Sequence, residues 1–297
     1  MRGTLRAAVA LLLVPMFFAS SQSWAQVLVQ DLLPNPKIEV FYSEPTSARL
    51  KPIYERLKQR RVLERLAIFL SPIKLTLPLK ISTAECGGMT RAHSRANGAT
   101  VCYEFVEEVK RLAQPGSGLT KEKVVAGAFA QGTLYRVSLA IIDILDVPVW
   151  GRYTDAADRL TANLMLEFGP DVAQMTFRGA YQFFLTAAKQ GKIWDGSDFA
   201  ATRSPDKQRM YNYLCMAFGH EILRNEGSNA AIYPSVLDGS TVAEFAVALG
   251  PRLRRCVGEY SAGLDAFVST IFTNHIDAGK WNKIAQSRLF DVGDFSP

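Results

Sequence analysis

The chain has 297 residues, of which 48% are apolar, 21% are charged and 10% are aromatic. This composition excludes a disordered or collagen-like chain and is sufficient for a large hydrophobic core. The net charge of +6 is not concentrated in one run, so nothing beyond mild basicity supports nucleic-acid binding, and we expect no nucleic-acid partner.

The segment 1–25 has the pattern of a secretory signal peptide. A start with two arginines precedes an apolar run over 7–18, which is too short for a membrane helix, and small residues stand at Ser23 and Ala25 before the expected cleavage site. We expect cleavage after Ala25, which leaves 26–297 as a single mature domain of charge +4 with no membrane span. An uncleaved membrane anchor is the alternative. The pattern predicts a bacterial protein that is periplasmic or secreted.

Alternating apolar residues predict a small sheet in the N-terminal part of the mature chain. The predicted strands cover 37–43, 74–83 and 99–105. Apolar residues at helical spacing predict a helix over 47–70, which Pro72 ends, and a short helix after the third strand.

From about residue 119 the pattern is helical almost to the end of the chain. A small sheet followed by a mainly helical remainder predicts an α+β fold. The expected helices cover 120–145, 154–168, 170–189, 205–224, 241–248 and 252–272.

The mature chain contains four cysteines, and an even number in an oxidising compartment predicts two disulfides. The sequence allows three pairings. In one of them Cys86 pairs with Cys102 and closes a short loop between two predicted strands, and Cys215 pairs with Cys256 and joins two predicted helices. Metal binding is the alternative, but the chain has no Cys-x-x-Cys pair.

Two long predicted helices are joined by a short linker that contains Trp150. The first helix is apolar along most of its length, whereas the second begins with a polar turn that carries Asp155 and Asp158. We interpret a polar helix start after a buried helix as the lining of a cleft, with Trp150 exposed beside it.

Several motifs at fixed spacings run through nearly all of the mature chain. On these motifs the chain resembles a family of secreted bacterial metallopeptidases that is catalogued as a domain of unknown function. The resemblance implies a zincin-like helical domain against which the small sheet packs, and zinc as the cofactor. The motifs are Ala84-Glu-Cys-Gly87, Thr100-Val-Cys-Tyr-Glu104, Leu145-Asp-Val-Pro-Val-Trp-Gly-Arg152, Asp155-Ala-Ala-Asp158, Gln208-Arg-Met-Tyr-Asn-Tyr-Leu-Cys-Met-Ala-Phe-Gly219, Arg255-Cys-Val-Gly-Glu-Tyr260 and His275-Ile-Asp277.

In the family that the chain resembles, the first helix carries His-Glu-x-x-His and the linker is followed by Gly-Arg-Glu-Glu-Asp-Ala-Ala-Asp. Histidines four residues apart lie on one face of a helix and can bind one zinc ion. The glutamate between them activates the metal-bound water as a general base. A third ligand from the next helix completes an open tetrahedral site.

This chain departs from the family motif at each of these positions. Counting back from Asp146, the histidine positions fall on Tyr135 and Leu139, and the glutamate position falls on Arg136. The third ligand position falls on Thr154. None of these side chains is a usual zinc ligand, so we expect no bound metal, no cofactor and no zinc-dependent catalysis.

The two acids of the second helix, Asp155 and Asp158, are retained. We expect Arg136 to fill the vacant metal position and to pair with one of them, because a guanidinium would partly replace the charge of the metal. Alternatively, Arg136 faces the solvent.

The three histidines of the chain are weak candidates for a metal site. His220 begins a sequence with an arginine where a second zinc-binding histidine would stand, and we interpret it as part of a helix end. His93 is expected to be solvated and His275 to be structural.

The sequence favours an exported, catalytically inactive relative of the metallopeptidases, which binds or scaffolds another exported protein or a peptide. The first alternative is an active zinc-dependent peptidase or hydrolase with an unrecognised site. The second is a structural, envelope-associated protein with no small ligand. An accessible cleft around Trp150 would argue against the second alternative.

Overall fold

A computed structural model of the chain describes seven stretches of the sequence. The predicted signal peptide and His93 lie outside the described residues. The described stretches are 34–89, 98–115, 118–189, 204–225, 235–287, 289–291 and 293–297.

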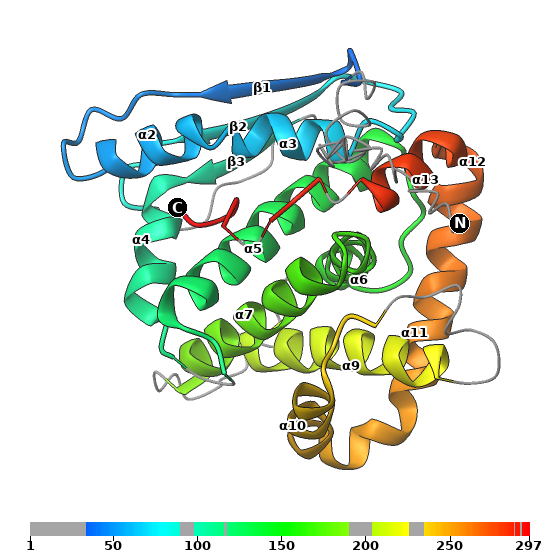
Figure 1. Cartoon of the computed structure of the whole chain (residues 1–297). Helices are drawn as coiled ribbons and strands as arrows, with labels where there is room; N and C mark the ends of the chain where they lie inside the picture. The colour runs from blue at the N-terminus through cyan, green and yellow to red at the C-terminus, as the bar shows by residue number, and fades with distance from the viewer. Residues whose placement is uncertain are drawn as a thin grey trace, which may run out of the picture.

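Three short strands form a parallel sheet near the N-terminus of the described chain. The strands β1 (Ile38–Tyr42), β2 (Leu79–Ala84) and β3 (Gly98–Cys102) lie side by side in chain order. A parallel pair needs a long crossover connection, and two helices provide it between β1 and β2. Figure 1 shows the sheet and these two helices above the long helices that make up the rest of the protein. The predicted α+β fold is confirmed.

The second and third strands are shorter than the sequence predicted. The second begins only at Leu79, because Pro78 cannot donate a hydrogen bond to a neighbouring strand. The third ends at Cys102, and α4 (Tyr103–Leu112) begins directly after it. In a short apolar run, alternation and helical spacing are hard to distinguish, and the burial of Tyr103, with Val106 and Val109 at helical spacing, favours the helix.

The single helix predicted over 47–70 is two helices, α2 (Lys51–Gln59) and α3 (Val62–Phe69). They meet at Arg61, whose left-handed backbone (φ 53°) cannot continue a right-handed helix. The C-terminal segment of the chain packs along both helices, and Arg65 of α3 forms an ion pair with Asp294 at 2.8 Å.

The helix α5 (Lys121–Ile144) is the centre of the helical part and packs closely on α7 (Pro170–Lys189). The two backbones touch at Gly127, where a Cβ atom would lie 2.3 Å from the backbone oxygen of Met175, so only glycine fits. By length and composition α5 could cross a membrane, but 89% of its most apolar window is buried inside the protein. This burial is what the core helix of a folded domain requires.

The remaining elements surround α5 and α7, as Figure 1 shows. The last predicted helix ends in a short π-helical turn, η3, and the sequence did not predict α13. The two disulfides are Cys86–Cys102, at the end of the sheet, and Cys215–Cys256, between α9 and α11. The prediction of two disulfides is confirmed, and of the three possible pairings the structure has this one. The elements around α5 and α7 are α6 (Tyr153–Leu166), α9 (Asp206–Arg224), α10 (Gly239–Leu249), α11 (Leu253–Phe267), η3 (Val268–Phe272), α12 (Thr273–His275) and α13 (Ala278–Gln286).

Candidate functional site

The positions that the resemblance assigns to the zinc ligands lie together where α5 meets the start of α6. Tyr135 and Leu139 are about one helical turn apart on α5, and both are partly exposed on a mostly buried helix. The hydroxyl of Tyr153, in the first turn of α6, donates to the backbone oxygen of Leu139 at 2.8 Å. Thr154 follows directly and is also partly exposed, so these positions are neighbours in the folded chain.

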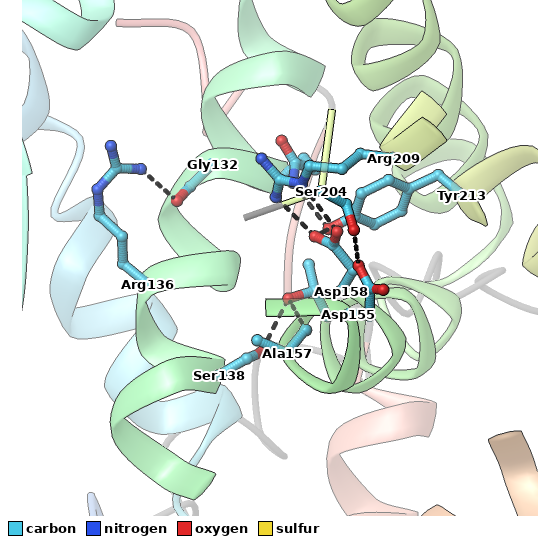
Figure 2. Close-up of polar contacts among 11 residues, drawn as sticks. Gly132, Arg136, Ser138, Asp155, Ala157, Asp158, Ser204, Arg209 and Tyr213 are labelled. Atoms are coloured by element: carbon cyan, nitrogen blue, oxygen red, sulfur yellow. Dashed lines mark hydrogen bonds and ion pairs between the residues drawn. The ribbon is translucent and has the colours of Figure 1, made fainter. Parts of the chain in front are cut away.

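Asp158 is the centre of a buried hydrogen-bonded network, which Figure 2 shows. Arg209 of α9 donates to both of its carboxylate oxygens, at 2.8 and 2.6 Å, and the Tyr213 hydroxyl donates to one of them at 2.7 Å. Gln131 of α5 donates to the Tyr213 hydroxyl at 2.8 Å. The side chains of Arg209 and Asp158 are only 4% and 2% exposed. The network therefore joins α5, α6 and α9 around one carboxylate.

The charge of Asp158 determines the protonation states of its neighbours. Burial disfavours the charged guanidinium of Arg209, but the adjacent carboxylate outweighs this effect and raises the pKa of Arg209. Burial, and then the charge of Asp158, raises the pKa of the Tyr213 hydroxyl well above its ordinary value, so this group remains a hydrogen-bond donor. The guanidinium carbon of Arg209 lies 4.1 Å from the ring centre of Tyr135 and 5.0 Å from that of Phe184.

The prediction that Arg136 pairs with Asp158 or Asp155 is wrong. Arg136 donates to a backbone oxygen one turn earlier in α5, at 2.8 Å, and its guanidinium carbon lies 4.7 Å from the ring centre of Phe105. Figure 2 shows this side chain pointing away from both acids. Neighbouring residues of a helix are about 100° apart around its axis, so Arg136 and Tyr135 face different sides of α5. The alternative of a solvent-facing Arg136 is also wrong, because the residue is 7% exposed.

Asp155, the other retained acid, has different neighbours from Asp158. The Ser204 hydroxyl donates to Asp155 at 2.5 Å, and Arg152 donates to the same hydroxyl oxygen at 3.3 Å. Asp155 is partly exposed, whereas Asp158 is buried. The two acids therefore do not converge on one metal position.

The side chains at the expected zinc site do not fit a zinc ion. Zinc in proteins takes imidazole nitrogens, thiolates and carboxylates. The three ligand positions hold a phenol, an aliphatic side chain and a hydroxyl, from Tyr135, Leu139 and Thr154. The nearby carboxylate of Asp158 already accepts two hydrogen bonds from Arg209. We therefore derive no reaction step through a metal in this protein.

Other side chains of the described residues that could bind a metal make different interactions. Cys86, Cys102 and Glu104 lie together, but the two sulfurs form a disulfide and the carboxylate of Glu104 accepts the backbone N–H of Cys86. His220 is 4% exposed, and burial lowers its pKa to about 4, so it is neutral at pH 7. The backbone at His275 pairs with the segment before β2.

A cleft of about 370 Å³ lies on another face of α6 from Asp158. Its walls come from the linker before α6, from α6 itself and from α11 and η3. Trp150 lines this cleft with 97% of its surface exposed, which confirms the prediction from the linker. Asp155 also lines the cleft, whereas Asp158 is not among its lining residues.

The residues that satisfy Asp158 are absent from the set predicted from the sequence. Arg209 and Tyr213 are four residues apart in one helix, so they share a face, and they belong to the motif over 208–219 that marks the family resemblance. An arginine and a tyrosine on one helix face can both donate hydrogen bonds to one carboxylate. The sequence around Arg209 and Tyr213 does not indicate which carboxylate of the chain they bind.

Comparison with known proteins matches the chain to a family model. The family model DUF4344, described as a putative metallopeptidase, matches residues 42–239, which is about two thirds of the chain. No curated protein and no solved structure matches the chain. The matched region contains β2, β3, α5, α6 and α9, whereas nearly all of β1 and the α11 and η3 wall of the Trp150 cleft lie outside it.

Proposed function

Because the chain belongs to the DUF4344 family of putative metallopeptidases, we propose that it is an exported metallopeptidase-like protein without zinc-dependent catalysis. Its role is to bind or scaffold another exported protein or a peptide. The chain keeps the two acids of the family motif, Asp155 and Asp158, while the residues that would carry the chemistry are replaced.

One observation carries this proposal. At the place where the resemblance puts two histidines and a third zinc ligand, the chain has Tyr135, Leu139 and Thr154, and the only cation beside Tyr135 in the described network is the guanidinium of Arg209. A protein site that holds zinc for catalysis needs three donors and an open fourth position. These three side chains offer one hydroxyl, one phenol and no charge.

Export is supported by the cysteines and by the start of the chain. All four cysteines form disulfides, and disulfides persist in oxidising compartments such as the periplasm and the extracellular medium. The apolar segment after the first arginines fits a signal peptide that is removed from the mature protein.

The test is the metal content of the mature protein, residues 26–297, after dialysis against a weak chelator. We expect less than about a tenth of an equivalent of zinc, because a site without charged or imidazole donors releases the ion. About one equivalent of zinc would overturn the proposal and favour the alternative of an active zinc-dependent peptidase. A pooled peptide library, incubated with the protein and analysed by mass spectrometry, should also show no cleavage that a strong chelator abolishes.

A further inference from the structure

We propose that the cleft beside Trp150 binds an extended peptide segment in which an apolar side chain stands next to a carboxylate. The inference rests on the proposed function for the source of the peptide, which is an exported partner protein. The site itself is derived from the cleft alone.

One face of α6 forms a wall of the cleft. Asp155, Arg159 and Asn163 follow one another at four-residue intervals, so they form a stripe along the helix, and all three line the cleft. Asp158 lies outside this stripe and points toward α9. The cleft is therefore separate from the positions that correspond to the zinc ligands.

The remaining walls of the cleft are mostly apolar. Phe267 of α11 and Ile271 of η3 line it, together with Leu160 of α6. Trp150 is 97% exposed, although a tryptophan gains more than most residues from burial. Exposed tryptophans beside a pocket are typical of binding hot spots. An apolar side chain in the cleft would cover both this ring and the apolar walls.

Asn163 supplies the polar group in the floor of the cleft. It is only 5% exposed, and its amide makes no hydrogen bond with the described residues. An amide that lines a cleft can both donate and accept a hydrogen bond there. A peptide group has one donor and one acceptor, so a bound peptide backbone would satisfy both sides of this amide.

The charges of the cleft favour an anionic ligand. Arg159 is exposed on its wall and forms no ion pair with the described residues. Arg152 also lines the cleft, while the single acid there, Asp155, already accepts a hydrogen bond from Ser204. A carboxylate next to the apolar side chain would pair with Arg159.

The size of the cleft limits what it can hold. A volume of about 370 Å³ lies near the lower end of the range for ligand pockets and suits two or three residues of a peptide. The π-helical turn that contributes Ile271 supports a binding role for the cleft, because such turns are frequent at functional sites.

The test is affinity selection from a synthetic library of N-acetylated octapeptide amides with the mature protein. We expect the selected peptides to carry an apolar residue beside aspartate or glutamate. Trp150→Ala should weaken their binding at least about tenfold, and Trp150→Phe should restore most of it. Arg159→Gln should remove the preference for the acidic peptide over its amide counterpart, which is roughly a two- to fivefold effect at low salt.

Two exposed positions away from the cleft provide matched controls. Val247→Ala on α10 and Arg254→Gln on α11 remove an exposed apolar side chain and an exposed arginine, and we expect both to leave binding unchanged. No selected peptide, or equal binding by the Trp150→Ala variant, would overturn the inference. Octanoate, a small apolar anion, tests whether the cleft binds a small ligand rather than a peptide. Displacement of the peptides by octanoate at equal concentration would overturn the proposal of a peptide ligand.

The two proposals fail in different ways. Zinc at about one equivalent would overturn the inactive-site proposal, and the peptide result would still decide the role of the cleft. A zinc-free protein that selects no peptide would overturn this inference and leave the loss of zinc chemistry standing.

Discussion

Arg209 and Asp158 form a two-bonded ion pair in which the side chains are 4% and 2% exposed. The two residues are 51 positions apart in the chain and join α9 to α6. Because each charge is removed from water, each depends on the other, and the pair holds these helices in a fixed relation. It also makes Asp158 a structural anchor rather than a free carboxylate.

Removal of one partner of this pair should destabilise the protein strongly. We expect Asp158→Asn to lower the free energy of unfolding by about 3–5 kcal/mol, because it leaves a buried, unpaired guanidinium. The measurement is urea denaturation followed by circular dichroism. The control is Glu108→Gln, which breaks the more exposed pair with Arg111 and should cost less than about 1 kcal/mol.

A double variant separates charge from packing in the same pair. Asp158→Leu with Arg209→Met should be less destabilised than Asp158→Leu alone, because no unpaired charge remains. If the loss of unfolding free energy in the double variant equalled the sum of the losses in Asp158→Leu and in Arg209→Met, the two side chains would not be coupled. The description of the pair as a structural anchor would then be wrong.

Zinc binding should be recoverable at the three ligand positions. Tyr135→His, Leu139→His and Thr154→Glu together should take up about one equivalent of zinc, because these positions are neighbours and partly exposed. Isothermal titration with zinc checks this, and the matched control omits Leu139→His. A folded triple variant without zinc affinity would show that the assigned positions are wrong.

Position 136, which corresponds to the catalytic glutamate of the family motif, should behave differently from the three ligand positions. Arg136 lies against Phe105 on a buried side of α5, so Arg136→Glu would place a carboxylate in an apolar environment. Added to the triple variant, it should lower the melting temperature without raising zinc affinity. An unchanged melting temperature would contradict the buried orientation of residue 136.

Glu167, directly after α6, should make stability depend on pH. Burial raises its pKa from 4.5 to about 7, although a hydrogen bond with Trp281 partly opposes the shift. Between these pH values the folded state keeps a proton that the unfolded chain has lost, so stability falls as the pH rises from about 4.5 to 7. Glu167→Gln should therefore melt at a higher temperature than the wild type at about pH 8.

The gain from Glu167→Gln should disappear near pH 4.5, where the wild-type side chain is protonated in the folded state. Thermal unfolding at both pH values checks this difference. Glu39→Gln, which removes an exposed glutamate on β1, is the control and should show no such change with pH. An equal effect of Glu167→Gln at both pH values would contradict the raised pKa.

The two disulfides should differ in how much they stabilise the protein. The Cys215–Cys256 bond encloses a sequence separation of 41 residues, and the Cys86–Cys102 bond one of 16. On the loop-entropy model, paired replacement by alanine should cost about 4 kcal/mol for the first and about 3 kcal/mol for the second. Urea denaturation of the two double variants measures both losses. Four titratable thiols in the unfolded, unreduced wild type would contradict both bonds.

Much of the fold could be predicted from the sequence, because helices and strands depend on local periodicity. The long apolar segment became α5, the acid-bearing segment became α6, and the cysteine pairs joined the predicted elements. Apart from the missed helix α13, the errors concern boundaries, such as the break at Arg61, where a left-handed residue has no strong signal in the sequence. The sheet was shorter than predicted at Pro78 and after Cys102.

The sequence alone shows that Tyr135, Arg136 and Leu139 stand where the resemblance places His-Glu-x-x-His, because side-chain chemistry can be read without coordinates. Which cation meets Asp158 was decided only by the tertiary structure. Arg136 and Arg209 were both available in the sequence, and helix rotation turned Arg136 toward Phe105 while the packing of α9 on α6 brought Arg209 to the acid. The Trp150 cleft likewise needs α11 and η3, more than a hundred residues further along the chain, so only the folded chain could bring its walls together.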